Sequence, residues 1–160
     1  MMRLGRGLMS LCVVLGGACR AEEAVSSPEP VEVRLELRSD TTFQCTVTGV
    51  HDGDGPIYCR ELDVQGKPVK IRLNGIAARE LDETCRPGHP CPTASGADAK
   101  AALSTLVSGR VLDCRSVGKS FSRVVAICLA GGKDVSCSMV ASRTALRWPR
   151  HDPQGLLESC

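Results

Sequence analysis

A tight acidic turn is the first stretch of the sequence with residue types suited to chemistry. Residues 51–55 read His-Asp-Gly-Asp-Gly, so Asp52 and Asp54 flank a glycine at positions i and i+2. Two aspartates at this spacing can converge on one hard divalent cation, which prefers carboxylate oxygens. Aspartate and glycine are also common in hairpin turns. The turn therefore has a metal-binding interpretation and a purely structural one.

A second stretch places a glutamate eight residues after an arginine. The run from Lys70 to Ile76 reads Lys-Ile-Arg-Leu-Asn-Gly-Ile and leads into Ala-Ala-Arg-Glu, with Arg72 on a predicted strand and Glu80 beyond its exit. Guanidinium groups suit phosphate oxygens, and a carboxylate held between arginines stays ionised and can take a proton from water. Alone, each side chain could simply face solvent. Together with Arg123, at the start of a later strand, they favour a site for a phosphate ester.

Alternating and β-branched segments predict the elements that must position these residues. Three strands in a meander are followed by a helix and two more strands, at Thr42–Val50, Pro56–Val64, Val69–Ile76, Arg110–Ser116 and Arg123–Ala130. The predicted helices are an alanine-rich one, capped by Thr93 or Ser95 and ended by Gly109, and a last one from about Asp134 to Leu146. The last two strands turn at Gly118. Val31–Leu37 alternates strictly and is either an edge strand or a loose segment.

This order of elements predicts the α+β class, mainly β: a five-stranded OB-type Greek-key barrel with two to three helices. We expect the domain to span residues 41–150 and to be followed by a C-terminal tail at 151–160. Aromatic residues make up only 2% of the sequence. A small core of aliphatic side chains is marginally stable, which is a physical reason for covalent cross-links.

The first 21 residues are predicted to be an export signal. Basic residues precede an apolar run that is too short to span a bilayer, and small residues follow. Cleavage is predicted before Cys19 or after Ala21, and the run Leu15-Gly-Gly-Ala-Cys resembles a loose lipoprotein box that would put a lipid anchor on Cys19. Residues 22–40 form an acidic, proline-bearing linker. We therefore expect a protein that is periplasmic, secreted or envelope-anchored in a bacterium.

The distribution of charge favours a polyanionic partner. The whole chain carries a formal net charge of +2. Residues 41–150 hold 15 Lys and Arg against 10 Asp and Glu, a net charge of +5, whereas residues 22–40 are net −4 and residues 151–160 net −2. A moderately basic domain suits nucleic acid without the extreme basicity of a dedicated coat protein. We expect single-stranded DNA or RNA as substrate or ligand, bound by a monomer.

Cysteine usage independently indicates an oxidising compartment. Without Cys12 and Cys19, which lie in the predicted signal, eight cysteines remain, an even number. Spacing alone leaves the pairing open. Predicted neighbouring strands and one short loop favour Cys45 with Cys59, Cys114 with Cys128, and Cys85 with Cys91, which leaves Cys137 with Cys160. The alternative for the short loop is a zinc site of Cys85, His89 and Cys91, which offers only three local ligands.

These motifs together resemble the staphylococcal nuclease (thermonuclease) family in their order and spacing. The resemblance covers about residues 42–148. It rests on Val-His-Asp-Gly-Asp at 50–54, Ile-Arg-Leu-x-Gly-Ile-x-Ala-x-Glu at 71–80, a cysteine-bounded loop before an alanine-rich helix, and Ser-Arg-Val-Val-Ala at 122–126. The cysteine-rich form resembles exported bacterial members in particular. The resemblance implies a metal-dependent phosphodiesterase that hydrolyses DNA or RNA and leaves 3′-phosphates.

The resemblance also implies a role for each matching residue. Asp54 would be the main calcium carboxylate, with Asp52 as its neighbour in the acidic turn. Arg72 and Arg123 would clamp the phosphate, and Glu80 would be the general base that activates the attacking water. Ca²⁺ is therefore the cofactor that we expect.

Several positions depart from the family's pattern. Where the family has an aspartate that is a second calcium ligand this chain has Ala77, where it has a proline this chain has Arg79, and Gly55 stands where many members have a threonine. Loss of an anionic ligand weakens calcium binding, because affinity follows ligand charge. Asp82 or Glu83 could supply an oxygen in place of the missing one.

A nucleic-acid contact surface is predicted from Arg79, Arg147 and Trp148. Arg79 would add positive charge near the phosphate, and Trp148 could stack on a base beside Arg147 at the end of the last helix. Basic residues there also complement a helix C-terminus. Two further functions stay open: a non-catalytic OB-type module that binds nucleic acid or another polyanion in the cell envelope, and a disulfide-rich envelope protein whose basic face binds a protein or a surface polymer.

Overall fold

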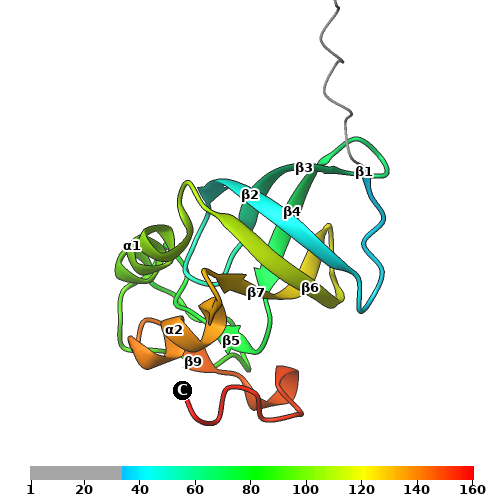
Figure 1. Ribbon diagram of the computed structural model, residues 1–160. Coiled ribbons are helices and arrows are strands. Elements are labelled where there is room, and N and C mark those ends of the chain that lie inside the picture. Colours follow the sequence, from blue (N-terminus) through cyan, green and yellow to red (C-terminus); the bar gives the residue numbers. More distant parts are fainter. Residues whose placement is uncertain (1–33) are drawn as a thin grey trace, which may run out of the picture. The chain divides into compact units, whose positions relative to one another are not determined.

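Five strands, each hydrogen-bonded to two others, close into a barrel in the computed structural model (Figure 1). The structure describes residues 34–160. The predicted export signal at 1–21, the predicted lipid anchor at Cys19 and residues 22–33 of the predicted linker lie outside these residues.

Antiparallel pairing and one parallel pairing build the barrel. Its strands are β2 (Thr42–Val50), β3 (Ile57–Asp63), β4 (Pro68–Leu73), β6 (Val111–Ser120) and β7 (Arg123–Ala130). The pairs β2–β3, β3–β4, β2–β6 and β6–β7 are antiparallel, and β4–β7 is parallel and closes the ring. The mainly β architecture with five barrel strands and two helices agrees with the prediction and is consistent with an OB-like barrel.

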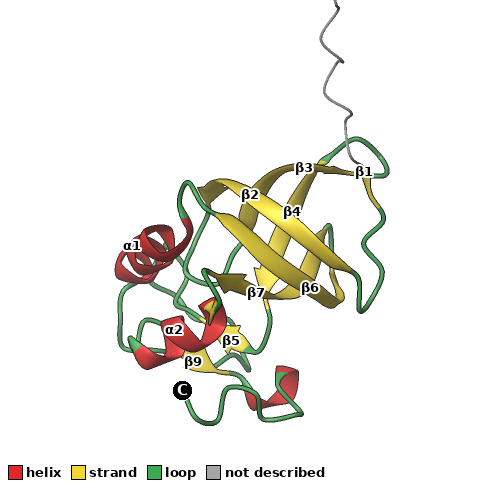
Figure 2. Cartoon of the chain, viewed as in Figure 1, coloured by secondary structure: helices red, strands yellow, loops and turns green. Residues whose placement is uncertain are grey.

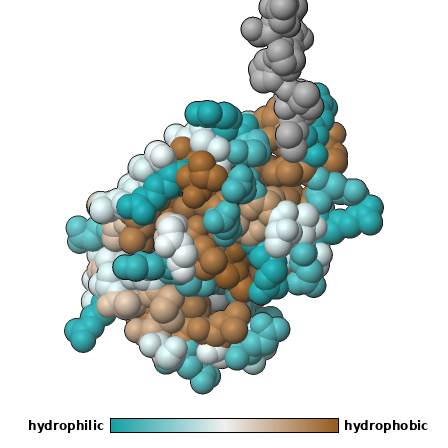
Figure 3. Space-filling model, in the orientation of Figure 1, coloured by the Kyte–Doolittle hydropathy of each residue, from teal (hydrophilic) through white to brown (hydrophobic). Residues whose placement is uncertain are grey.

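Alternation along the strands sorts side chains between the core and the outside of the barrel. In β4, Val69, Ile71 and Leu73 are buried, while Lys70 and Arg72 between them stay partly exposed. Full burial of such an aliphatic side chain is worth about 1.5–3 kcal/mol. On the face shown in Figure 3, apolar and hydrophilic side chains are interspersed. The alternation that builds the core thus also directs Arg72 outward.

Two helices lie beside one end of the barrel (Figure 2). Helix α1 (Gly96–Val107) begins after Ser95, whose hydroxyl accepts a hydrogen bond from the backbone N–H of Asp98 at 3.0 Å. Gly109, which follows the helix, has a positive φ of 69°, as a helix-terminating glycine commonly does. The predicted helix is confirmed, and Ser95 is its cap. Helix α2 (Val135–Ala141) is capped by Asp134.

Helix α2 is shorter than predicted, because residues beyond Ala141 make other contacts. The hydroxyl of Ser142 donates back to the carbonyl oxygen of Met139 at 3.0 Å, and Arg143 has a positive φ of 60°, which leaves the helical conformation. Strand β9 (Leu146–Arg147) then pairs with β5 (Ile76–Ala77), and a 3-10 turn, η1, follows at Pro149–His151. The prediction of a helix to Leu146 was wrong.

Two further boundaries differ from the predictions. The third barrel strand ends at Leu73 instead of continuing to Ile76, because Asn74 and Gly75 form a turn before β5. Strand β6 runs through Gly118, where the register shifts, and the chain reverses at 121–122. Two short strands also join the sheet. Strand β1 (Arg34–Leu35) is parallel to β3 and agrees with the edge-strand alternative for that segment, and β8 (Lys133–Asp134), which was not predicted, pairs with β7.

The four expected disulfides are present. They join Cys45 to Cys59, Cys85 to Cys91, Cys114 to Cys128 and Cys137 to Cys160. The zinc alternative is wrong, because Cys85 and Cys91 are bonded to each other. Four disulfides indicate an oxidising, extracellular environment. Within residues 34–160, no helix combines the length and the apolar character that crossing a membrane requires.

One buried carboxylate ties the C-terminal segment to the barrel end. The side chain of Asp152 is 1% exposed and accepts hydrogen bonds from Nε of Arg147 at 2.7 Å and from the N–H groups of Leu156 and Leu157 at 2.9 and 3.1 Å. Burial alone would raise the pKa of Asp152, but these hydrogen bonds lower it below its ordinary value. The segment is therefore packed against the domain, beside the disulfide to Cys160.

Asp152→Asn should reduce the free energy of unfolding by about 2 kcal/mol, because it removes charge-assisted hydrogen bonds from a buried site. Urea unfolding of the oxidised protein at pH 7 measures this. Since the pKa of Asp152 is lowered in the folded state, the difference between the proteins should vanish as pH falls through that pKa and Asp152 becomes neutral. Glu158→Gln, at an exposed partner of Arg147, is the matched control; an equal loss in both variants would contradict the assignment.

Candidate functional site

A cleft lies where the ends of β4 and β7 meet the acidic turn and the C-terminal segment. It is a cavity of about 420 Å³. Six predicted site residues line it together: Asp52, Asp54, Arg72, Glu80, Arg123 and Trp148. Arg86, His89, Lys119, Phe121 and His151 also line it, and the motifs did not place them at a phosphate site. Residues distant in the sequence thus meet in one hollow.

Arg72 is the most firmly held cation of the cleft. Its side chain is 12% exposed, forms an ion pair with the Asp54 carboxylate, and donates to the carbonyl oxygens of Asp54 at 3.1 Å and Ile76 at 3.2 Å. Burial lowers the pKa of Arg72 to about 10, so the guanidinium stays charged at neutral pH. On the neighbouring parallel strand Val125 pairs with Arg72, and Arg123 lies two residues earlier on the same face.

The acidic turn is fixed by hydrogen bonds and by close packing. Asp54 Oδ2 accepts from the N–H of Ala78 at 2.9 Å, and Asp52 Oδ1 accepts from the N–H of Asp54 at 3.2 Å. A Cβ at Gly53 would lie 2.4 Å from Cβ of Ala99 in α1, so only glycine allows this approach. Asp52 is buried, and that burial raises its pKa despite the nearby charge of Arg72.

Glu80 reaches the cleft from the loop after β5. Its Oε1 pairs with Nε of Arg86 at 2.7 Å, and 29% of its side chain is exposed. A Cβ at Gly96 would lie 2.1 Å from the Glu80 carbonyl oxygen, so the start of α1 packs directly on the Glu80 backbone. Arg86 lies in the loop closed by Cys85 and Cys91, and its approach to Glu80 depends on that loop. The positions of Glu80 and Arg86 in the sequence did not predict that they form an ion pair.

Trp148 and two histidines form an aromatic wall of the cleft. The ring centroid of Trp148 lies 4.1 Å from that of His89 and 4.2 Å from that of His151. Burial, followed by the charges of Arg72 and Arg86, lowers the pKa of His89 below its ordinary value of 6.5. Burial and the charge of Arg150 lower the pKa of His151 in the same direction. Both imidazoles are therefore neutral at pH 7.

Two predicted nucleic-acid contacts lie elsewhere and have structural partners. Arg79 donates to the carbonyl oxygens of Glu83 at 2.8 Å and Pro92 at 2.9 Å, so it braces the loop. Arg147 pairs with Asp152 and with Glu158, at 2.7 and 3.0 Å. Neither lines the cleft. Intramolecular acceptors engage both guanidinium groups, and the prediction that Arg79 and Arg147 contact nucleic acid stays a prediction.

The residues present do not fit a calcium cage. Ca²⁺ takes 6–8 oxygen ligands, several of them carboxylate. Asp54 is engaged by Arg72 and by the N–H of Ala78, and Ala77 is fully buried in β5 with no side-chain oxygen. Asp82 accepts from Thr84, Glu83 accepts from the N–H of Gly96, and neither lines the cleft. The oxygens that could have replaced the missing ligand are therefore not at the site.

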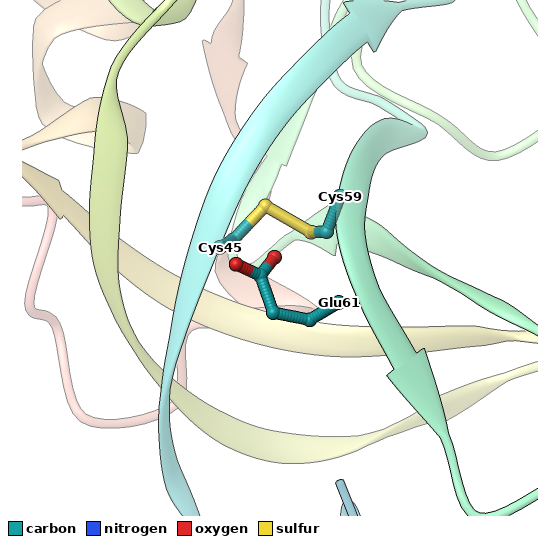
Figure 4. A group of neighbouring side chains, drawn as sticks. All are labelled: Cys45, Cys59 and Glu61. Atoms are coloured by element: carbon teal, nitrogen blue, oxygen red, sulfur yellow. A yellow bond between two sulfur atoms is a disulfide. The ribbon is translucent and has the colours of Figure 1, made fainter. Parts of the chain in front are cut away.

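One cluster of metal-ligating residue types occurs among residues 34–160, at Cys45, Cys59 and Glu61 (Figure 4). Cys45 and Cys59 are joined in a disulfide, so they offer no thiolate. The Glu61 carboxylate accepts from the N–H and the hydroxyl of Thr46 at 2.9 and 2.7 Å. This cluster is a cross-link with a satisfied carboxylate beside it, and it does not have the character of a metal site.

No protein-family model matches the chain, and a search of curated proteins finds no match. The resemblance to staphylococcal nucleases therefore stands on the motif residues alone. The side chains of the cleft determine its possible chemistry: arginines for a phosphate, three carboxylates at its wall, and an aromatic surface for an apolar ring.

Asp54→Asn should tighten binding of a single-stranded octathymidylate roughly fivefold in the presence of chelator, because Arg72 loses its internal anionic partner. Fluorescence anisotropy at low salt measures the Kd. Asp113→Asn removes the same charge from the outside of β6 and controls for net charge. Weaker binding by Asp54→Asn, or an equal gain in both variants, would show that Asp54 does not restrain Arg72.

The same octathymidylate should bind more tightly as pH falls below 6.5. Because the pKa values of His89 and His151 are lowered, both rings are neutral at pH 7 and add positive charge to the cleft only in more acidic solution. Phosphodiester groups do not titrate in this range. A His89→Gln/His151→Gln double variant should lose most of the pH dependence between pH 7.5 and 5; an unchanged profile would assign the effect to another group, such as Asp52.

Proposed function

We propose that this protein is an exported phosphodiesterase that acts on single-stranded nucleic acid. The observation that carries the proposal is the convergence of Arg72, Arg123 and Glu80 in one cleft with an aromatic wall. Two guanidinium groups on neighbouring strands suit the oxygens of a phosphodiester, and a carboxylate beside them suits activation of water. The staphylococcal-nuclease resemblance assigns the same roles to the same residues.

The charges of the cleft favour an anionic ligand. Four cations line the cleft, namely Arg72, Arg86, Lys119 and Arg123. Three carboxylates line it as well, namely Asp52, Asp54 and Glu80. Arg72 pairs with Asp54, and Arg86 pairs with Glu80. Lys119 and Arg123 form no ion pair within residues 34–160, so they are available to a phosphate.

The proposed reaction needs only groups that line the cleft and water. Arg72 and Arg123 donate to the non-bridging oxygens and stabilise the charge that develops on them. Glu80 takes a proton from the attacking water as the new P–O bond forms and the bond to the leaving sugar oxygen breaks. That oxygen takes a proton from solvent, and Glu80 returns its proton to solvent. The resemblance makes the 5′ oxygen the leaving group and a 3′-phosphate the product.

An oligonucleotide suits the cleft better than a small phosphate does. Trp148, between His89 and His151, offers a flat ring beside the phosphate-binding groups, and base stacking on such a ring is worth about 1–3 kcal/mol. OB-type barrels, with which this five-stranded barrel is consistent, bind oligonucleotides on their surface. The predicted export signal and the four disulfides support a protein that acts outside the cytoplasm of a bacterium. A lipid on Cys19 would hold it at the membrane.

A non-catalytic binding module is the second candidate, and one observation favours it. Asp54 is held by Arg72 and Ala77 carries no oxygen, so the carboxylates of the turn are not free for the calcium that the resemblance implies. Such a cleft would hold a phosphodiester without an efficient means of cutting it. Both candidate functions include binding of a nucleic-acid strand, and only the phosphodiesterase cuts it.

Glu80→Gln should lower the rate of cutting of single-stranded DNA and RNA at least 100-fold while leaving the fold intact and oligonucleotide binding no weaker, because loss of a general base costs about 10²–10⁴ in rate. The measurement uses the oxidised domain from residue 22 onward, with calcium, with magnesium and with chelator. Glu158→Gln is the matched control. Binding without cutting in every arm would favour the binding module, and equal rates for parent and variant would remove Glu80 from the reaction.

A further inference from the structure

A second cavity adjoins the cleft and shares part of its wall. Its volume is about 670 Å³, and it lies between the segment at 35–38, the turn that joins β3 to β4, and the turn that joins β6 to β7. Lys119, Phe121 and Arg123 line both cavities. The two hollows are therefore neighbours along one side of the barrel, separated by the turn that carries Phe121.

The side chain of Phe121 is exposed to an extent that packing of the folded chain does not account for. It is 93% exposed, the most exposed of the large apolar side chains that the structure describes, and it has a positive φ of 55°. A two-residue hairpin turn commonly requires a positive φ at its first loop residue, so the turn accounts for this conformation. The hairpin pair of Ser120 with Arg123 forms on either side of it. An aromatic ring held in solvent between two cavities is suited to stacking on a ligand.

The alternation of β4 extends the basic surface from one cavity into the other. Lys70 lines the second cavity and Arg72 lines the cleft. They lie two residues apart on the same face of the strand, about 7 Å along it. Lys70 and Lys67 form no ion pair within residues 34–160. Lys70 and Arg72 thus place two cations on the same outer face of β4, one in each cavity.

The carboxylates of the second cavity have intramolecular partners. Glu36 pairs with Arg38 at 2.6 Å. Asp63 accepts from the N–H groups of Gln65 and Lys67, both at 2.9 Å, and so stabilises the turn. Five cations line the second cavity against these two carboxylates, so it keeps a net positive charge, and a polyanion complements the groove better than an apolar or cationic partner.

We propose that the two cavities form one track for a single nucleic-acid strand, with a base stacked on Phe121 where the cavities meet. Lys67 and Lys70 contact phosphates on the far side of Phe121 from the cleft. The inference rests on the proposed function and adds to it the class of substrate: an oligonucleotide long enough to occupy both cavities, bound within its length and not only at an end.

Chain length separates this track from the cleft alone. On this proposal a dithymidylate occupies the cleft alone, whereas an octathymidylate is long enough to reach the second cavity as well. Phe121→Ala should weaken binding of the octamer about tenfold or more, the size of one lost base stack, and weaken binding of the dimer to a smaller extent, because only the octamer continues past Phe121 into the second cavity. Phe121→Trp should restore octamer binding. Lys67→Gln/Lys70→Gln should act on the octamer alone and reduce the dependence of its Kd on salt.

Two control variants and the Kd values of the dimer and the octamer test the proposed track. Leu129→Ala, at an exposed position near the other end of β7, controls for loss of an apolar side chain, and Lys133→Gln controls for loss of a lysine; neither should change Kd. Octamer binding that is equal in Phe121→Ala and the parent would overturn the track. Arg123→Ala should weaken dimer and octamer alike. If Arg123→Ala weakens binding of neither the dimer nor the octamer, the proposed function is wrong, independently of the result for Phe121→Ala.

Discussion

The parallel pairing of β4 with β7 is the constraint on which the barrel and the cleft both depend. The other four pairings leave a curved sheet with two open edges, and this one joins the edges. Its register sets Arg72 beside Val125 and brings Arg123 to the same outer face. The aliphatic side chains on the inner face fix that register, because a shift by one residue would turn them outward. Core packing therefore determines the spacing of the two guanidinium groups.

Inside the cleft, the strongest electrostatic contacts are between the protein's own groups. Arg72 is held by Asp54, and Glu80 by Arg86. A phosphodiester that enters must compete with these pairs, and in return it gains groups already oriented by strand pairing and by the loop closed at Cys85 and Cys91. The side chains of the cleft are therefore already oriented for a ligand, but two of its cations are paired with the protein's own carboxylates. Lys119 and Arg123, without such partners in the described part of the chain, give the anion its first attraction.

Local patterns predicted the parts of the structure that local physics determines. Strand alternation found β4 and placed Arg72 on it, and the capping residues found α1. Contacts between distant segments were not visible to the same reasoning. Arg79 and Arg147 have the residue type of a phosphate contact, but Pro92 and Asp152 engage them only in the folded chain. His89 reaches Trp148 from a distant segment for the same reason, whereas His151 lies only three residues along the chain from Trp148. The sites of cross-linking were predictable, because neighbouring strands limit which cysteines meet.

Two of the disulfides hold walls of the cleft and not only the core. One closes the loop that carries Arg86 and His89, and the other ties the C-terminal segment, next to Trp148 and His151, back to α2. In a reducing compartment both closures are absent, and the groups that line the cleft on that side lose their covalent support. Maturation of the site is thereby linked to oxidation. On the proposed function, a cell that makes this protein would keep its own nucleic acid and the completed cleft in different compartments.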